Sequence, residues 1–164
     1  MSKIVQLDEH LSNMIAAGEV VERVSSVVKE LIENSLDAKS SEITIELVDS
    51  GIREIKVTDN GIGMDKEDLK ISYLRHATSK IKNQYDLFRI STLGFRGEAL
   101  PSIASVSDMT IKSNDGSIGY YIHLRASKLM DEGIISLNKG TEVTVCNLFF
   151  NTPARLKYLK NENV

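Results

Sequence analysis

The stretch Val27-Val-Lys-Glu-Leu-Ile-Glu-Asn-Ser-Leu-Asp-Ala38 decides how the rest of this 164-residue chain is arranged. On a helical wheel its apolar and small side chains fill one arc about 140° wide. Glu30, Asn34 and Asp37 lie along one edge of that arc, and Glu30 and Asn34 are i,i+4 neighbours. The stretch therefore predicts a helix with two carboxylates and an amide at the margin of a buried face. Two interpretations stay open: a site for a hydrated metal ion or a phosphate, or an ordinary solvated boundary.

The composition predicts one domain with a real hydrophobic core. Hydrophobic residues make up 41% of the chain and charged residues 26%, which argues against disorder. The net charge of −3 argues against a dominant nucleic-acid-binding surface. Cys146 is the one cysteine, so an internal disulfide is excluded and a reducing compartment is favoured. No apolar run is long enough to span a bilayer, so we expect a soluble intracellular protein without a membrane partner.

Hydrophobic periodicity predicts the order of the elements. The central helix is expected to be capped by Ser25 or Ser26 and to end near Lys39. Further helices are expected after Asp65, from about Glu98 and after Thr152-Pro153. Strands are expected at residues 42–48, 53–58, 109–112, 119–124, 134–137 and 141–148. This order predicts an α+β sandwich, in which a mixed, mostly antiparallel sheet is covered by helices on one face.

Two glycine-containing segments lie where a ligand could be held. Asp59-Asn-Gly-Ile-Gly-Met64 follows a strand, and its acid can accept a hydrogen bond from an exocyclic amine while the glycines let the backbone approach a ligand. Thr92-Leu-Gly-Phe-Arg-Gly-Glu-Ala-Leu100 suits a mobile loop whose N–H groups face an anion at a helix N-terminus. Each has an ordinary alternative: Asp-Asn-Gly is common turn chemistry, and Gly94 and Gly97 fit a plain loop.

Two widespread nucleotide-binding motifs are absent from the sequence. No Gly-x-x-x-x-Gly-Lys-Ser/Thr occurs, which excludes a P-loop. No Gly-x-Gly-x-x-Gly follows the first expected strand, which argues against a dinucleotide-binding fold. What the chain offers is an acid and an amide on a helix, Asp-x-Gly-x-Gly after a strand, and a glycine-rich segment.

These pieces resemble the ATP-binding motifs of the GHKL (Bergerat-type) group, which includes gyrase, heat-shock chaperones, histidine kinases and MutL. Within that group the chain is similar to the MutL family of DNA mismatch-repair ATPases, over its whole length. Five segments carry the resemblance: Ile15-Ala-Ala-Gly-Glu-Val-Val21, Glu33-Asn-Ser-Leu-Asp-Ala38, Ala77-Thr-Ser-Lys80, Gly94-Phe-Arg-Gly-Glu-Ala-Leu100 and Asn151-Thr-Pro-Ala-Arg155. The heptapeptide at 94–100 is highly specific to that family.

The resemblance implies a role for each matching residue. Glu30 matches the general base that activates the water attacking the γ-phosphate of ATP, and Asn34 matches the ligand that holds Mg²⁺. Asp59 matches the carboxylate that reads the 6-amino group of adenine, with Gly61 and Gly63 bringing the backbone to the base. The remaining ATP contacts, in the lid and in the last motif, are expected from Thr78, Ser79, Gly94, Arg96, Gly97, Glu98, Ala99, Leu100 and Thr141. Asp37 is expected to support the helix end rather than contact the nucleotide.

The chain departs from the family pattern in three respects. Val24 stands where many members carry Pro, which weakens the start of the helix slightly and leaves the site intact. Lys39 stands where many members carry a helix-ending Gly, so a left-handed residue there would cost roughly 1 kcal/mol. The largest departure is length, because members continue through the rest of the ATPase domain and further domains. Residues 1–164 are therefore expected to be a C-terminally truncated ATPase domain that hydrolyses ATP weakly, since a lysine from the second domain and stable dimerisation are missing.

The resemblance also implies partners. Residues 1–20 are expected to be an arm through which two copies dimerise on binding ATP. The dimer would couple the mismatch sensor MutS to a downstream endonuclease or helicase, with DNA bound by the fuller protein. The expected location is the bacterial cytoplasm, or the nucleus if the source is eukaryotic. Two alternatives remain: a nucleotide-dependent interaction module that does not hydrolyse ATP, and an ATPase of the histidine-kinase or topoisomerase type.

Overall fold

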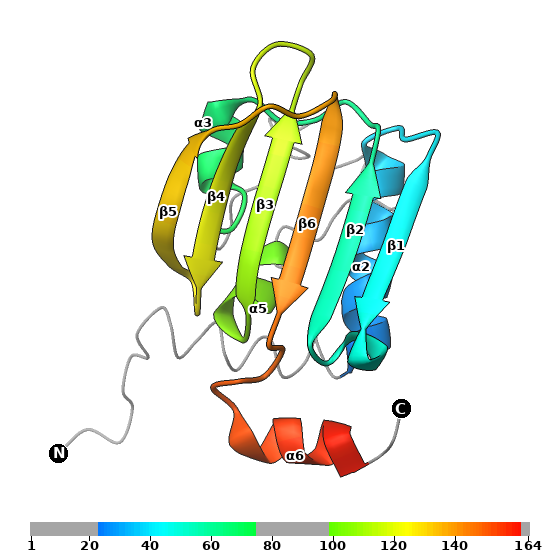
Figure 1. Ribbon diagram of the computed structural model, residues 1–164, viewed down its shortest axis with the longest axis vertical. Coiled ribbons are helices and arrows are strands. Elements are labelled where there is room, and N and C mark those ends of the chain that lie inside the picture. Colours follow the sequence, from blue (N-terminus) through cyan, green and yellow to red (C-terminus); the bar gives the residue numbers. More distant parts are fainter. Residues whose placement is uncertain (1–22, 75–98, 162–164) are drawn as a thin grey trace, which may run out of the picture.

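The computed structural model describes residues 23–74 and 99–161 of the chain. They form an α+β fold in which one sheet carries helices (Figure 1). The first half contains α2 (Val24–Asp37), β1 (Ile43–Val48), the 3₁₀ turn η1 (Asp49–Gly51), β2 (Glu54–Asp59) and α3 (Lys66–Ile71). The second half contains α5 (Ala99–Ser105), β3 (Asp108–Asn114), β4 (Tyr120–Arg125), β5 (Lys128–Ile134), β6 (Gly140–Cys146) and α6 (Pro153–Asn161).

The described strands form one six-stranded sheet in the order β1-β2-β6-β3-β4-β5. Every neighbouring pair is antiparallel. The prediction of a mostly antiparallel sheet is confirmed, but the description of it as mixed is wrong for these strands. β2 and β3 do run in the same direction, because each is antiparallel to β6. Since β6 is inserted between them, they are not neighbours and no parallel ladder forms.

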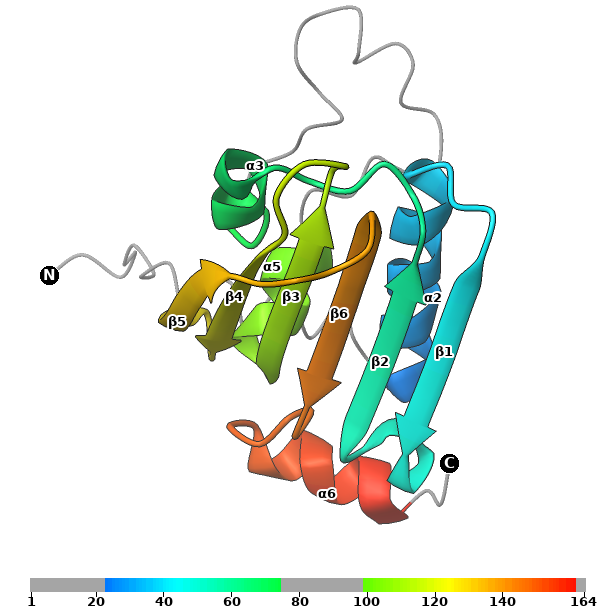
Figure 2. The ribbon, with the colours of Figure 1, turned by 45° about the horizontal axis from the view of Figure 1, so that its top comes forward.

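Strand register gives the four inner strands two apolar rows on the helix-covered face of the sheet. Figure 2 shows α2 and α5 on the same side of the sheet. Because side chains alternate between faces along a strand, residues that are paired across the sheet share a face. The two rows are Ile55, Val145, Met109 and Leu124, and then Val57, Val143, Ile111 and Ile122, all of them buried. The next row in the same phase is polar: Asp59, Thr141, Ser113 and Tyr120.

Helix α2 buries the face that its sequence predicts. Val27 and Leu31 are 0% and 1% exposed, and Ser35 lies in the same buried arc. The start of the helix is not the predicted one, since the N-cap is Arg23, without a side-chain hydrogen bond, rather than Ser25 or Ser26. α2 therefore begins before either serine and relies on its buried valines rather than on a cap.

Helix α2 ends close to Lys39, as predicted, and the chain turns at Lys39 itself. Lys39 has φ 59°. Its N–H donates to the Leu36 carbonyl at 3.0 Å, and the Ser40 N–H donates to the Ser35 carbonyl at 3.3 Å. This is the paired hydrogen-bonding pattern that usually ends a helix at a glycine. A lysine therefore holds a left-handed position here, at a cost of roughly 1 kcal/mol.

Strand β5 corrects one prediction. A strand was expected at residues 134–137, whereas β5 spans Lys128–Ile134 and pairs with β4. The two strands are joined by Ala126 and Ser127, with φ 48° and 69°. Two left-handed residues make a tight hairpin, but Ala-Ser lacks the Asn-Gly signature that would reveal it in a sequence. β5 is also an exposed edge strand without a clear apolar alternation.

Candidate functional site

Asp59 lies at the end of β2, in the polar row above the two apolar rows. Its Oδ2 atom accepts a hydrogen bond from the Ser35 hydroxyl of α2 at 2.7 Å. Its Oδ1 atom accepts from the N–H of Gly61 at 2.9 Å and from the N–H of Thr141 at 3.2 Å. Three elements therefore hold one carboxylate: the end of α2, the turn after β2, and the start of β6.

The partners of Asp59 leave room for one more donor. An ionised carboxylate has about four positions at which its oxygens accept hydrogen bonds. Oδ1 uses both of its positions on backbone N–H groups, and Oδ2 uses one on Ser35. Among the described residues nothing donates to the second position of Oδ2. The geometry therefore suits a ligand that presents a single N–H or O–H to Asp59.

The glycines after Asp59 bring the loop against the protein itself. A Cβ atom on Gly61 would lie 2.5 Å from the Ala38 carbonyl oxygen, at the end of α2. Gly63 has φ 71°, and a Cβ there would lie 2.0 Å from the Asn114 carbonyl oxygen, at the end of β3. Both positions therefore exclude a side chain for packing reasons alone. Their predicted approach to a bound base stays a prediction.

Ser113 connects the segments around Thr141, and the sequence reasoning missed it. Its hydroxyl oxygen accepts from the Met64 N–H at 2.8 Å and lies 3.1 Å from the Gly140 carbonyl and 2.7 Å from the Thr141 hydroxyl. The side chain is 0% exposed. The signal available in the sequence was a serine in the inward phase of an apolar strand, but its partners depend on strand register.

The predicted catalytic and metal-binding residues, Glu30 and Asn34, lie on α2 in the turns that lead to Ser35. Glu30 is 5% exposed and Asn34 is half-buried one turn later. The hydrogen bond from Ser35 to Asp59 fixes the C-terminal part of α2 beside the end of β2. Glu33, a second carboxylate on this helix, is also buried, at 6% exposed, and was not predicted to be. The roles predicted for Glu30 and Asn34 stay predictions.

Most of the predicted lid lies outside the described residues. Within α5, Ala99 is buried in the core and Leu100 packs against it, so their side chains serve packing. The predicted arm at residues 1–20 is likewise outside the described part. The same holds for the lid residues Thr78, Ser79, Gly94, Arg96, Gly97 and Glu98.

Tyr120 ends the polar row and ties α3 to the far edge of the sheet. Its hydroxyl donates to Glu132 Oε1 at 2.6 Å, and the Lys70 ammonium lies 3.3 Å from the same oxygen. The ammonium of Lys66 lies 5.2 Å from the centre of the Tyr120 ring. The hydrogen bond to Glu132, followed by burial, raises the pKa of Tyr120 to about 12. The same hydrogen bond is the main cause that lowers the pKa of Glu132.

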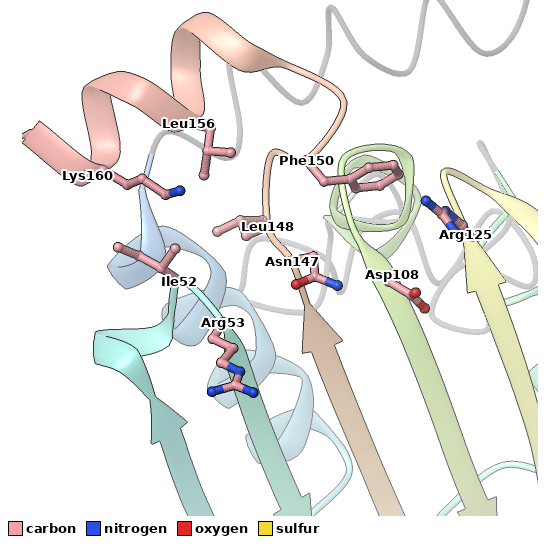
Figure 3. A pocket seen from close by; sticks show the side chains of 9 residues that line it. All are labelled: Ile52, Arg53, Asp108, Arg125, Asn147, Leu148, Phe150, Leu156 and Lys160. Atoms are coloured by element: carbon pink, nitrogen blue, oxygen red, sulfur yellow. The ribbon is translucent and has the colours of Figure 1, made fainter.

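A cavity of about 340 Å³ lies at the opposite end of the sheet, where β6 leads into α6 (Figure 3). Its apolar part is formed by Ile52, Leu148, Phe150 and Leu156. Arg53 and Arg125 extend to different sides of it rather than toward a common point (Figure 3). None of the residues predicted to bind a ligand lines this cavity. The candidate site is therefore the polar row around Asp59.

Two classes of feature were not found within residues 23–74 and 99–161. No group of three or more His, Cys, Asp or Glu side chains is placed to hold a metal ion. No helix in this part of the chain has the length and apolar character needed to cross a membrane.

Comparison with known proteins agrees with this fold. Residues 22–146 match the model of the histidine kinase-, DNA gyrase B- and HSP90-like ATPase family. The chain is 59% identical to the DNA mismatch repair protein MutL of Streptococcus uberis and 60% identical to that of Bacillus licheniformis. Each match covers 98% of this chain and 25% of the relative, so the chain spans about a quarter of their length.

Two solved structures have a similar fold. The Aquifex aeolicus MutL ATPase domain complexed with ADP has a TM-score of 0.66 at 34% identity, and the match covers 88% of this chain and 51% of that chain. The N-terminal domain of a DNA repair protein has a TM-score of 0.78 at 32% identity, and the match covers 96% of this chain and 46% of that chain. The chain therefore belongs to the histidine kinase-, DNA gyrase B- and HSP90-like ATPase family, and within it to the MutL group.

Proposed function

We propose that this chain binds ATP, with the 6-amino group of adenine donating to Asp59. The observation that carries the proposal is the one open acceptor position of Asp59 Oδ2, at the end of β2. The amino group offers a hydrogen at that point, whereas guanine would bring a carbonyl oxygen against the carboxylate. Gly61 and Thr141 donate to the same carboxylate, and we assign them, together with Gly63, to the proposed adenine site.

The phosphates would be held by the remaining predicted residues. We assign lid contacts to Thr78, Ser79, Gly94, Arg96, Gly97 and Glu98, and backbone contacts to Ala99 and Leu100. These two lie at the start of the described part of α5, directly after the predicted lid. The ADP complex of the Aquifex aeolicus relative supports a nucleotide as the ligand.

We propose further that the chain hydrolyses ATP. Glu30 would act as general base by orienting and deprotonating the attacking water, from a buried position on α2. The amide oxygen of Asn34 would be the protein ligand for Mg²⁺. When bound, Mg²⁺ would offset the charge of the phosphates.

In the whole protein we propose that ATP drives a dimerisation switch in DNA mismatch repair. Residues 1–20 would form the arm that joins two copies, and residues 1–164 would be part of the ATPase domain. The similarity to DNA mismatch repair proteins supports a role in that repair. As partners we propose the mismatch sensor MutS, DNA, and a downstream endonuclease or helicase. The place of action would be the compartment that holds the chromosome, which is the cytoplasm in bacteria.

The proposal is tested by equilibrium binding of Mg-ATP and Mg-GTP to the chain and to Asp59→Asn. We expect ATP to bind and GTP to bind much more weakly, and Asp59→Asn to lose ATP binding. Asp131→Asn is the matched control, because Asp131 is exposed on β5 and should leave binding unchanged. A folded chain that binds neither nucleotide, or an Asp59→Asn variant that binds ATP as the parent does, would contradict the proposal.

A further inference from the structure

The buried hydroxyl of Ser113 has three polar neighbours of different kinds. The Met64 N–H, 2.8 Å away, can only donate. The Gly140 carbonyl, 3.1 Å away, can only accept. The Thr141 hydroxyl, 2.7 Å away, can do either. Because Ser113 is 0% exposed, these neighbours must satisfy it without help from bulk water.

Counting hydrogens selects one arrangement. A hydroxyl carries one hydrogen to donate and two lone pairs to accept with. If Ser113 donates to Gly140, it accepts from both Met64 and Thr141, and all three contacts are hydrogen bonds. If Ser113 donates to Thr141 instead, its bond to the Gly140 carbonyl is lost. The first arrangement keeps one more hydrogen bond, so it is the favoured one.

In that arrangement the Thr141 hydroxyl gives its hydrogen to Ser113 and keeps both lone pairs. Among the described residues, nothing donates to those lone pairs. Thr141 and Asp59 are cross-strand partners on one face of the sheet. The row therefore presents two acceptors side by side, the Thr141 hydroxyl oxygen and the open position of Asp59.

We propose that Ser113 is a positioning residue that makes Thr141 a hydrogen-bond acceptor toward the base, so that the row selects an amino group over a carbonyl at position 6 of a purine. The inference rests on the proposed function, since it concerns the same adenine site. Asp59 alone repels a carbonyl oxygen, and Thr141, held by Ser113, adds a second acceptor that a carbonyl cannot satisfy. Ser113 itself does not touch the ligand.

The test compares Mg-ATP with Mg-ITP, which carries a carbonyl at position 6. In Ser113→Ala the hydrogen of Thr141 is free to point at the ligand, so the preference for ATP over ITP should fall about fivefold, the effect of one hydrogen bond. If the role of Ser113 were purely structural, the substitution would weaken the binding of both nucleotides alike and leave the ratio of their affinities unchanged. Ser107→Ala is the matched control, because Ser107 is also 0% exposed but bonds to Ile103 at the other end of the sheet.

A second variant changes Thr141, the member of the Ser113–Thr141 pair that would face the ligand. Thr141→Val removes the acceptor while keeping the shape of the side chain, so it should also lower the preference for ATP over ITP. When Thr141→Val is already present, adding Ser113→Ala should not change the ratio of the ATP and ITP affinities any further. An unchanged ratio in folded Ser113→Ala, or in Thr141→Val if the first variant does not fold, overturns the inference. Failure of the parent chain to bind ATP would overturn the proposed function instead.

Discussion

The Ser35 hydroxyl of α2 donates to Asp59 Oδ2 across a distance of 2.7 Å, and this contact joins the helix layer to the end of β2. Ser35 is 3% exposed and belongs to α2, so a helix and not a loop fixes its position. The contact occupies one of the two positions of Oδ2 and so decides which of them is left open. Ser35 therefore orients the carboxylate that we assign to adenine recognition.

Ser35→Ala should weaken ATP binding by about fivefold and destabilise the chain by about 1 kcal/mol, because one buried hydrogen bond is lost and the carboxylate is freer to rotate. Calorimetric titration with Mg-ATP and chemical denaturation measure the two effects. Ser25→Ala, at an exposed position of the same helix, should change neither by as much. Unchanged affinity in Ser35→Ala would show that the other two bonds suffice to orient Asp59.

Glu30→Gln should abolish ATP hydrolysis and spare ATP binding, since general-base catalysis contributes about 10²- to 10⁴-fold in rate. Phosphate release in a single-turnover assay is the suitable measurement, because turnover by this chain is expected to be slow. Glu33→Gln provides a matched control: it alters another buried carboxylate of α2 and should keep the rate within a few fold. Equal loss in both variants, or no loss in Glu30→Gln, would favour a module that binds nucleotide without hydrolysing it.

Lys39→Gly should stabilise the chain by roughly 0.5–1 kcal/mol, because glycine adopts the left-handed conformation at the end of α2 without the steric cost that lysine incurs. The free energy of unfolding in urea is the quantity to measure. Lys29→Gly, in the exposed middle of the same helix, should instead destabilise the chain by about 1 kcal/mol. If both variants lose stability, the φ of 59° at Lys39 is not under strain.

Tyr120 should make the stability of the chain fall at high pH. Its pKa is raised from 10.0 to about 12, so the folded state holds the phenolic proton more tightly than the unfolded state does. The resulting stabilisation is complete below pH 10.0 and is lost as pH rises toward about 12. Unfolding measured across this range should therefore show a steeper loss for the parent chain than for Tyr120→Phe.

Glu132→Gln supplies the control for that experiment. Removing the carboxylate takes away the hydrogen bond that is the largest cause of the shift, so the pKa of Tyr120 should move back toward its ordinary value. The pH dependence of this variant should then resemble that of Tyr120→Phe. An absorbance titration of the tyrosines that shows no group with a pKa near 12 would contradict the assignment.

The elements with strong local patterns could be predicted from the sequence. The apolar arc of α2, the cap of α3 at Asp65, and the strands that carry the core rows follow from periodicity and turn residues. The hairpin through Ala126 and Ser127 could not, because neither residue is typical of left-handed turns. β5 was therefore placed too far along the chain.

Individual residues of the candidate site could be named from the sequence, but how they are arranged relative to one another could not. Asp59 was predicted to read adenine and Thr141 to be one of the ATP contacts, and the structure makes them cross-strand partners. Ser113 was missed because its importance depends on which residues of β6 lie opposite β3. That register is a long-range property that no local pattern in the chain contains. The buried state of Glu33 was missed for a similar reason, since it depends on how α2 packs.

The position of β6 between β2 and β3 protects the sheet against a slip in strand register. A slip of β6 by one residue would bring Glu142 to the inward face in place of Thr141, and would also turn Val143 and Val145 out of the core. The cost of exposing those two valines far exceeds that of any single contact at the site. Burial of the hydrophobic interior therefore fixes the register, and a correctly folded chain presents Asp59 and Thr141 together on one face of the sheet.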